Sequence, residues 1–281
     1  MEVIPLSESV GAQIRGVDLS SPFDDPTFDA MHQAWLEHLV IVFREQSLSD
    51  QNLVQFSARF GELDAAPVDK FGRKFSSGFP ELTVISNVVE NGQPIGGLGN
   101  FEAVWHTDMS YNETPPKGSA LYSREVPDSG GNTGFLNMYA IYESLPHPLR
   151  ERIEGLQLKH DATHNSAGEL RSGMDVPVDI ALSPGAIHPL VRTHPDSARR
   201  ALFLGRRPYA YIMGLTRAES DTLLDELWAH CEQPQFSWHH QWDVGDLVLW
   251  DNRCAMHRRD SFDDAQRRLM VRTQIQGDRP S

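Results

Sequence analysis

Residues 242–257 read WDVGDLVLWDNRCAMH, and residues 267–275 read RRLMVRTQI. The first run has the pattern of a turn that leads into a buried strand at 247–250. In the second run, Leu, Val, Thr and Ile at 269, 271, 273 and 275 alternate with Met, Arg and Gln at 270, 272 and 274. Successive side chains of a strand point to opposite faces, so this run predicts a strand over 269–275 with Arg268, Met270 and Arg272 on one face.

Short runs of the same kind occur along the rest of the chain. They are rich in Val, Ile, Leu and Phe, they are bounded by turn formers, and they lie at 40–43, 82–85, 156–159 and 201–204. A chain with strands spread over its whole length is expected to be mostly β.

Helical patterns are fewer and lie between these strands. Apolar residues recur from Phe28 to Leu39 at spacings of 3, 4 and 4, which is one face of a helix. Ser49 can cap a second helix, and Thr216 with Glu219 has the pattern of a capping box before a third. The combination predicts a mostly β fold, a barrel or sandwich, with helical insertions. Periodicity alone leaves its topology open.

Composition restricts the class of protein. The 281 residues are 40% apolar and 23% charged, without a repeat or a break in composition, which predicts one domain over 1–281. The net charge of −14 argues against nucleic acid and anionic membranes as partners. We find no pattern of a secretory signal, and no apolar run approaches the roughly 20 residues of a membrane span. Two cysteines, Cys231 and Cys254, are expected to be reduced thiols in a cytoplasmic protein.

One histidine of the twelve has a carboxylate neighbour that suggests chemistry. In residues 103–108, AVWHTD, an extended backbone would point His106 and Asp108 to the same side, about 7 Å apart at the backbone. With one distant histidine they would form a 2-His-1-carboxylate facial triad, which binds iron and leaves its other positions open. The triplet alone equally fits a surface histidine beside a capping aspartate.

The predicted C-terminal strand carries two arginines on one face. Arg268 and Arg272 are four residues apart, so their Cα atoms would be about 13 Å apart in a strand. If the face is buried, each guanidinium needs an anion, and its planar fork suits a carboxylate. The alternative is a solvated face on which both arginines are in water.

Taken together, these motifs resemble the taurine dioxygenase/2,4-dichlorophenoxyacetate dioxygenase family. His257 precedes Arg268 by 11 residues and Arg272 by 15, as in the family pattern. The other matching segments are GAQIRGVDL at 11–19, VIVFR at 40–44, FSARFG at 56–61, WHTD at 105–108, GGNT at 130–133 and WDNRC at 250–254. Residues 85–88 and 99–101 look more like the aryloxyalkanoate branch than taurine dioxygenase itself.

The resemblance implies a fold and a set of roles. The fold would be a double-stranded β-helix, a cupin-like jelly-roll, with Fe(II) bound at its mouth by His106, Asp108 and His257. Thr133 and Arg268 would bind the distal carboxylate of the co-substrate 2-oxoglutarate. The family often has Gly-Gly-Asp-Thr where this chain has Gly-Gly-Asn-Thr at 130–133, but the hydroxyl of Thr133 is kept.

The implied reaction consumes O2 and 2-oxoglutarate, releases succinate and CO2, and hydroxylates a second substrate. Arg272 would face a small organic anion, a carboxylate, an aryloxyalkanoate or a sulfonate, and hydroxylation next to an ether oxygen or sulfur would cleave that bond. Asn87, Tyr111 and Lys70 are further candidates for substrate binding. Because related halogenases have a small residue in place of Asp108, its carboxylate favours oxygenation over halogenation.

Two other functions are compatible with these residues. One is a biosynthetic hydroxylase or desaturase of an amino acid or natural product. The other is a non-catalytic jelly-roll that binds a small molecule or a structural zinc. Zinc prefers four closed ligands, often cysteines, and only Cys254 is near a candidate ligand. The resemblance also implies a homo-oligomer, a dimer or tetramer.

Overall fold

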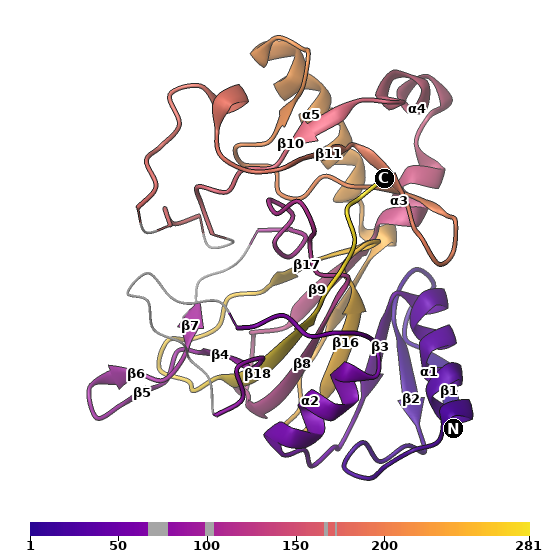
Figure 1. Ribbon diagram of the computed structural model, residues 1–281, viewed down its shortest axis with the longest axis vertical. Helices are drawn as coiled ribbons and strands as arrows, with labels where there is room; N and C mark the ends of the chain where they lie inside the picture. Colours follow the sequence, from indigo (N-terminus) through magenta and orange to yellow (C-terminus); the bar gives the residue numbers. More distant parts are fainter. Residues whose placement is uncertain (67–77, 99–103, 166–167, 172) are drawn as a thin grey trace.

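The structure, a computed structural model, describes residues 1–66, 78–98, 104–165, 168–171 and 173–281 (Figure 1). It is built mainly from β-strands with a few helices, as the sequence predicts. Within these ranges, no helix combines the length and the apolar character needed to cross a bilayer.

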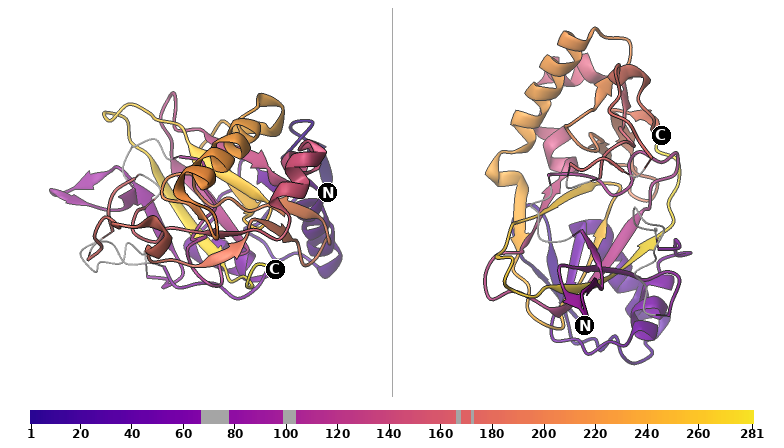
Figure 2. Two further views of the ribbon diagram at one scale, coloured as in Figure 1. Left: turned by 90° about the horizontal axis from the view of Figure 1, so that it is seen from above. Right: turned by 90° about the vertical axis from the view of Figure 1, so that its left-hand side faces the viewer.

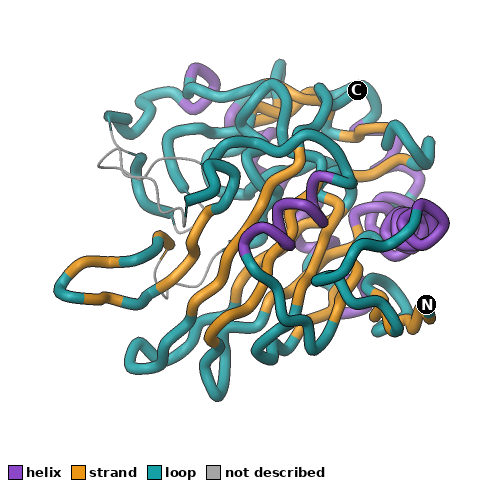
Figure 3. Tube along the Cα trace, turned by 60° about the horizontal axis from the view of Figure 1, so that its bottom comes forward, coloured by secondary structure: helices purple, strands orange, loops and turns teal. Residues whose placement is uncertain are grey.

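The largest sheet has eight strands, which run side by side through the centre of the molecule (Figures 1 and 3). Its neighbours pair antiparallel except for β2 with β3 and β4 with β7. In spatial order the strands are β1 (Glu2–Pro5), β2 (Ala12–Arg15), β3 (Val40–Phe43), β16 (Leu247–Asp251), β8 (Gly118–Glu125), β18 (Leu269–Ile275), β4 (Thr83–Ser86) and β7 (Gly97–Leu98).

A second sheet of three strands contains His257, one of the candidate site residues. It consists of β15 (Ser237–His240), β9 (Thr133–Asn137) and β17 (Ala255–Arg259), all antiparallel. The remaining strands form small sheets: β11 (Ile187–Pro189), β10 (Gln157–Lys159) and β14 (Tyr211–Ile212); β12 (Val191–Thr193) and β13 (Arg200–Leu202); and β5 (Val89–Glu90) and β6 (Gln93–Pro94).

Helices begin where the sequence has capping residues. In α2 (Asp50–Ala58) the Ser49 side chain completes a capping box, and in α5 (Arg217–Cys231) Thr216 and Glu219 do the same. Both predictions are confirmed. The predicted helix near Phe28 is α1 (Asp25–His38). The other helices are α3 (Met138–Ser144), α4 (His147–Ile153) and the 3-10 turns η1 (Ile180–Leu182) and η2 (Pro234–Phe236).

Both faces of the large sheet are buried. The face toward α1 and α2 contributes Val271 and Ile275 of β18 to one apolar cluster, together with Trp35 and Phe56 of the helices. The opposite face contributes Met270 to a second cluster. Strand alternation therefore turns Arg272 and Gln274 away from α2 and toward the second sheet. The longest helix, α5, lies at the other end of the molecule from α2 (Figure 2).

Strand boundaries differ from the predicted ones by one or two residues. The predicted run 201–204 is β13 over Arg200–Leu202, and the Phe203 N–H still donates to the Leu190 carbonyl directly beyond its end. The runs predicted at 40–43 and 269–275 are confirmed without change. Ends shift because the last pairings depend on neighbours elsewhere in the chain.

Candidate metal centre

Two histidines far apart in the sequence form a backbone pair. His257 lies in the middle of β17, and its N–H donates to the His106 carbonyl at 2.9 Å, while the His106 N–H donates to the His257 carbonyl at 3.0 Å. Residues that exchange both hydrogen bonds are directly opposed, so their side chains leave on the same side. The two imidazole rings are 4.2 Å apart between centroids.

Asp108 is not in a regular strand, and the prediction of an extended His106–Asp108 segment is wrong. His106 is an isolated bridge, and Asp108 begins a turn in which Met109 has a positive φ of 48°. Asn252, after β16, holds this turn: its Oδ1 accepts from the Asp108 N–H at 2.8 Å and its Nδ2 donates to the Asp108 carbonyl at 3.0 Å. The carboxylate therefore reaches the histidines because of a tertiary contact.

The three side chains converge. Oδ1 of Asp108 lies 3.7 Å from Nε2 of His106 and 3.8 Å from Nε2 of His257. One ligand atom from each residue falls within 4.8 Å of the other two, the spacing of a group that can hold a metal ion. Asp108 is 5% exposed, so an ion bound here would be largely removed from water.

The protonation of the three groups suits a cation. Nδ1 of His106 lies 2.8 Å from the Val104 carbonyl and therefore carries the hydrogen, which leaves a lone pair on Nε2. Burial, helped by the neighbouring His106, lowers the pKa of His257 to about 3, so its imidazole is neutral. Burial raises the pKa of Asp108, but the charge of Arg272 and the two histidines outweigh it and hold that pKa well below the usual range.

Arg268 is a buried cation without an anion. It is 2% exposed, and its Nε has no hydrogen-bond partner. In the part of the chain that the structure describes, no carboxylate pairs with it. Burial, and then the charge of Arg259, lower its pKa to about 9. The alternative of a solvated arginine face is wrong, because Arg268 is buried and a buried guanidinium needs an anion, which the described residues do not supply.

A glycine and a threonine of the same segment lie around the start of β9, and the glycine is close to this guanidinium. A side chain at Gly131 would lie 3.5 Å from Nε of Arg268, and Gly131 has a positive φ of 65°, which favours glycine. Thr133, two residues on, is buried at the start of β9, and its Oγ1 accepts a hydrogen bond from Nε1 of Trp242 at 3.0 Å. Because the hydroxyl oxygen is the acceptor there, its own proton is available for another acceptor.

Arg272 points at the triad. Its NH1 lies 3.3 Å from Oδ1 and 3.2 Å from Oδ2 of Asp108, and its side chain is 11% exposed. The sequence predicted that Arg272 shares a strand face with Met270, but left open whether that face is buried. It did not predict this ion pair, which depends on the turn at Asp108.

Two further side chains contact Asp108 and were not among the predicted site residues. Oγ of Ser119 donates to Oδ2 at 3.0 Å, and Nε2 of Gln274 lies 3.3 Å from the same oxygen. Strand alternation after Arg272 could have identified Gln274, because the two residues share a face. No sequence signal distinguishes Ser119 from other serines.

The remaining predicted substrate residues have different surroundings. The Asn87 amide is occupied by backbone: its Oδ1 accepts from the Arg268 N–H at 2.9 Å and its Nδ2 donates to the Gln266 carbonyl at 2.8 Å. Asn87 thus positions the start of β18. The Tyr111 ring is covered by the Arg171 guanidinium at 4.1 Å. The basic residues at 70, 73 and 74 lie outside the described residues.

A second group, His194, Asp251 and Cys254, has metal-like spacing but is an ion-pair network. Nδ1 of His194 accepts the N–H groups of residues 196 and 197, so its Nε2 carries the hydrogen and donates to Asp251 at 3.0 Å. Arg253 grips both oxygens of the same carboxylate, at 2.9 and 2.7 Å. No lone pair on these nitrogens remains for a metal, and both cysteines of the chain are free thiols.

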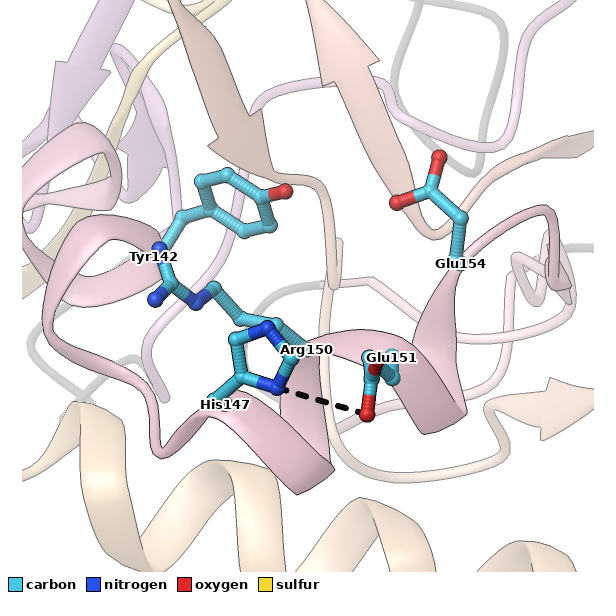
Figure 4. Close-up of a pocket in the computed structure, with 5 residues that line it drawn as sticks. All are labelled: Tyr142, His147, Arg150, Glu151 and Glu154. Atoms are coloured by element: carbon cyan, nitrogen blue, oxygen red, sulfur yellow. Dashed lines mark ion pairs between the residues drawn. The ribbon is translucent and has the colours of Figure 1, made fainter.

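A surface pocket of about 430 Å³ lies on α3 and α4 (Figure 4). Its lining residues are Tyr142, His147, Arg150, Glu151 and Glu154. His147 and Glu151 pair within it at 3.3 Å, and no residue of the triad lines it. The pocket is therefore separate from the triad.

Two histidines and one ionised carboxylate that converge in a β-rich protein are typical of one class of protein. They are the donor set of the mononuclear iron oxygenases, which bind the metal through a facial triad.

Comparison with known proteins identifies the family. The description "Taurine catabolism dioxygenase TauD, TfdA family" matches residues 2–274. The (S)-phenoxypropionate/alpha-ketoglutarate-dioxygenase of Sphingobium herbicidovorans is 34% identical over 99% of this chain and 95% of its own. The alpha-ketoglutarate-dependent 2,4-dichlorophenoxyacetate dioxygenase of Cupriavidus pinatubonensis is 35% identical over 95% of both chains. The crystal structure of AAD-2 in complex with Mn(II) and N-oxalylglycine superposes with a TM-score of 0.80 at 30% identity, over 99% of this chain and 98% of that one.

The chain belongs to the TauD/TfdA family. It is a 2-oxoglutarate-dependent dioxygenase that uses Fe(II) and O2. The predicted membership, with relatives in the aryloxyalkanoate branch, is confirmed.

Proposed function

We propose that His106, Asp108 and His257 are the ligands of the Fe(II) ion. The observation that carries this proposal is their convergence, with one ligand atom of each residue within 4.8 Å of the others. The imidazole of His257 is neutral and the carboxylate of Asp108 is ionised, so neither has to lose a proton to bind a cation. Two contacts fix the orientation of His257. Its ring lies 4.6 Å from that of Trp250, and its backbone pairs with that of His106.

We assign the distal carboxylate of 2-oxoglutarate to Arg268 and Thr133. The guanidinium is buried with an unpartnered Nε, and the threonine hydroxyl has a proton to donate. A carboxylate between them would pair the buried charge and restore the pKa that burial lowers.

The bound iron and 2-oxoglutarate together supply an oxidative decarboxylation, which releases succinate and CO2 and hydroxylates the second substrate. The chain supplies position and charge. Asp108 and the two histidines would hold the ion, and Arg268 would orient the co-substrate from its far end. The burial of these groups keeps water away from the reacting atoms.

The second substrate is a small organic anion, which we expect to be a carboxylate, an aryloxyalkanoate or a sulfonate. Arg272 supports this class, because its guanidinium has no anion except Asp108 within the described ranges and its Nε is unpartnered. The relatives named for phenoxypropionate and 2,4-dichlorophenoxyacetate favour the aryloxyalkanoates. Hydroxylation of the carbon next to the ether oxygen would give a hemiacetal that breaks, so the reaction would cleave the substrate. Tyr111 and Lys70 remain proposed substrate contacts.

A direct binding experiment tests this function. Phenoxyacetate, 2-phenoxypropionate, an alkyl sulfonate and an uncharged phenyl ether are added without oxygen to the Fe(II)–2-oxoglutarate complex. We expect the anions, and not the ether, to shift the metal-to-ligand absorption band and to stimulate succinate formation once oxygen is admitted. Stimulation by the uncharged ether as strong as by the anions would contradict the proposed role of Arg272.

Separate roles for the two arginines predict separate kinetic defects. Arg268→Ala should raise the KM for 2-oxoglutarate by about 100-fold, and Arg272→Ala should raise the KM for the anionic substrate by a similar factor, because each removes a buried charge partner. Arg267→Ala is the matched control, since this neighbour is exposed and pairs with Glu125. Steady-state kinetics with each substrate varied measures the effect. Equal effects of both variants on both substrates would show that the division of roles is wrong.

The carboxylate of Asp108 also predicts the outcome of the reaction. With an excess of chloride in the assay, the product should carry only a new hydroxyl group, because the carboxylate occupies the metal position that a halide would need. Mass spectrometry of the product distinguishes the two. A chlorinated product from the unaltered chain would contradict the assignment of Asp108 as a ligand.

We further infer that the large sheet and the β15–β9–β17 sheet form the two halves of a double-stranded β-helix, and that residues 1–281 make one domain. The structural similarity of AAD-2 over 99% of the chain supports both inferences. Two free, buried cysteines are typical of a cytoplasmic protein. Assembly into a dimer or tetramer is proposed from the family resemblance and is measured by light scattering.

A further inference from the structure

The two carboxylate oxygens of Asp108 have different surroundings. Oδ1 faces the two histidines at 3.7 and 3.8 Å. Oδ2 faces the large sheet, where it accepts from Ser119 at 3.0 Å, from Gln274 at 3.3 Å and from Arg272 at 3.2 Å. Arg272 also contacts Oδ1, at 3.3 Å. Of these three side chains, Ser119 and Gln274 therefore contact only Oδ2, which is called the outer oxygen below.

Ser119 and Gln274 form a pair across two neighbouring strands. They are direct partners in the register of β8 and β18, in the interior of the eight-stranded sheet. Directly opposed residues have their side chains on the same face and in contact. Ser119 is fully buried and Gln274 nearly so, which means that their positions are determined by the sheet and not by solvent.

This pair differs from Arg272 in what it can do during the reaction. The proposed substrate anion would compete with Asp108 for the guanidinium of Arg272, and the outer oxygen would then lose its charged partner. A carboxylate with a free second oxygen can rotate and bind a metal through both oxygens, which would occupy a position needed by the co-substrate or by O2. Ser119 and Gln274 are uncharged and buried in the sheet, so a bound substrate anion would not draw them away from Oδ2.

We propose that Ser119 and Gln274 are positioning residues that hold the outer oxygen of Asp108, so that the carboxylate binds the iron through Oδ1 alone. This inference rests on the proposed role of Asp108 as an iron ligand. It goes beyond that role because it assigns the orientation of the ligand to two side chains that touch neither the metal nor the substrate.

Metal affinity of the full-length, metal-free protein tests the proposal without using activity. Mn(II) is titrated into Ser119→Ala, Gln274→Leu and the double variant, and the free ion is followed by its electron paramagnetic resonance signal. Loss of a side chain that hydrogen-bonds to a metal ligand weakens metal binding by about 10- to 100-fold. We therefore expect the Kd for Mn(II) to rise about 10-fold in each single variant and about 100-fold in the double variant.

Two controls separate positioning from a general effect on the fold. Ser123→Ala removes a buried hydroxyl from the same strand, but one that bonds to the backbone of residues 243 and 246, so the Kd should stay within about twofold of the unaltered chain. Ser119→Thr keeps the hydroxyl and should recover most of the affinity. If Gln274→Leu does not fold, as judged by circular dichroism, Gln274→Asn replaces it, since the shorter amide cannot reach Oδ2.

The outcomes are distinct. A folded double variant that binds Mn(II) as tightly as the unaltered chain would overturn the proposal and leave the iron site intact. An equal loss of affinity in Ser123→Ala would also overturn it, because the effect would then belong to the sheet. Failure of the unaltered chain to bind Mn(II) at all would instead overturn the proposed function, and this inference with it.

Discussion

Replacing His257 by alanine is expected to lower 2-oxoglutarate turnover by at least about 1000-fold, since changes behind a metal ligand already cost about 10- to 100-fold. The loss follows from position. His257 supplies one of the three atoms that lie within 4.8 Å of one another, and its replacement would leave only His106 and Asp108 at the proposed metal site. Succinate formation with added Fe(II), measured by mass spectrometry, gives the turnover.

The matched control for this variant is His239→Ala. His239 lies on β15 of the same sheet, but its Nδ1 pairs with Asp260 at 3.1 Å and it is outside the converging group. This variant should retain most of the turnover. Retention of more than about a tenth of the activity by His257→Ala would argue against an iron ligand at this position, because ligand loss is expected to be far more costly.

The largest loss of stability is expected from Asp251→Asn. The Asp251 carboxylate is fully buried, accepts two hydrogen bonds from the Arg253 guanidinium and one from Nε2 of His194, and has no contact with water. Breaking a buried pair costs up to about 3–5 kcal/mol, because the buried guanidinium of Arg253 would keep, among the described residues, only its second, partly exposed partner, Asp196 at 2.7 Å. Reversible urea unfolding at neutral pH measures the free energy of unfolding.

The pH dependence of that loss has a definite sign. Burial raises the pKa of Asp251, but Arg253 and His194 outweigh it, so the pKa in the folded chain lies below the ordinary 3.8. A lowered folded pKa stabilises the protein above the unfolded value and loses this contribution as the pH falls toward the folded one. The difference in stability between the unaltered chain and the Asp251→Asn variant should therefore be full at neutral pH and shrink below about pH 4.

The control for stability is Asp221→Asn on α5. Asp221 pairs with Arg217 at 2.5 Å, but both side chains are partly exposed, and such pairs contribute about 0–1 kcal/mol. If Asp251→Asn cost no more than this control, the buried network would not be a source of stability, and the metal-like spacing of His194, Asp251 and Cys254 would need another explanation.

Local signals in the sequence were sufficient for several elements. The capping boxes at Ser49 and Thr216 act over three residues, and each marks the start of a helix in the structure. The alternation over 269–275 predicted both the bounds of β18 and the face that carries Arg272 and Gln274. These features depend on neighbours in the chain, so a reader of the sequence has all the information that determines them.

The convergence of the ligands could not be worked out in this way. His106 and His257 are 151 positions apart, and only the family resemblance connected them before the structure was known. The local pattern was also misleading, since His106 and Asp108 were expected to share a strand and Asp108 instead begins a turn held by Asn252. Asn87, expected at the substrate, supports the backbone before β18.

The sequence by itself determined the mostly β composition of the fold, the starts of its helices, and the family to which the chain belongs. Only the tertiary structure decided that Arg268 is buried with no carboxylate from the described residues beside it, that Arg272 faces Asp108, and that Ser119 and Gln274 contact Oδ2 of that carboxylate. The physical reason is range: propensity and periodicity act between near neighbours. Burial and pairing depend on which strands lie side by side, and for β8 and β18 the partners are about 150 residues apart.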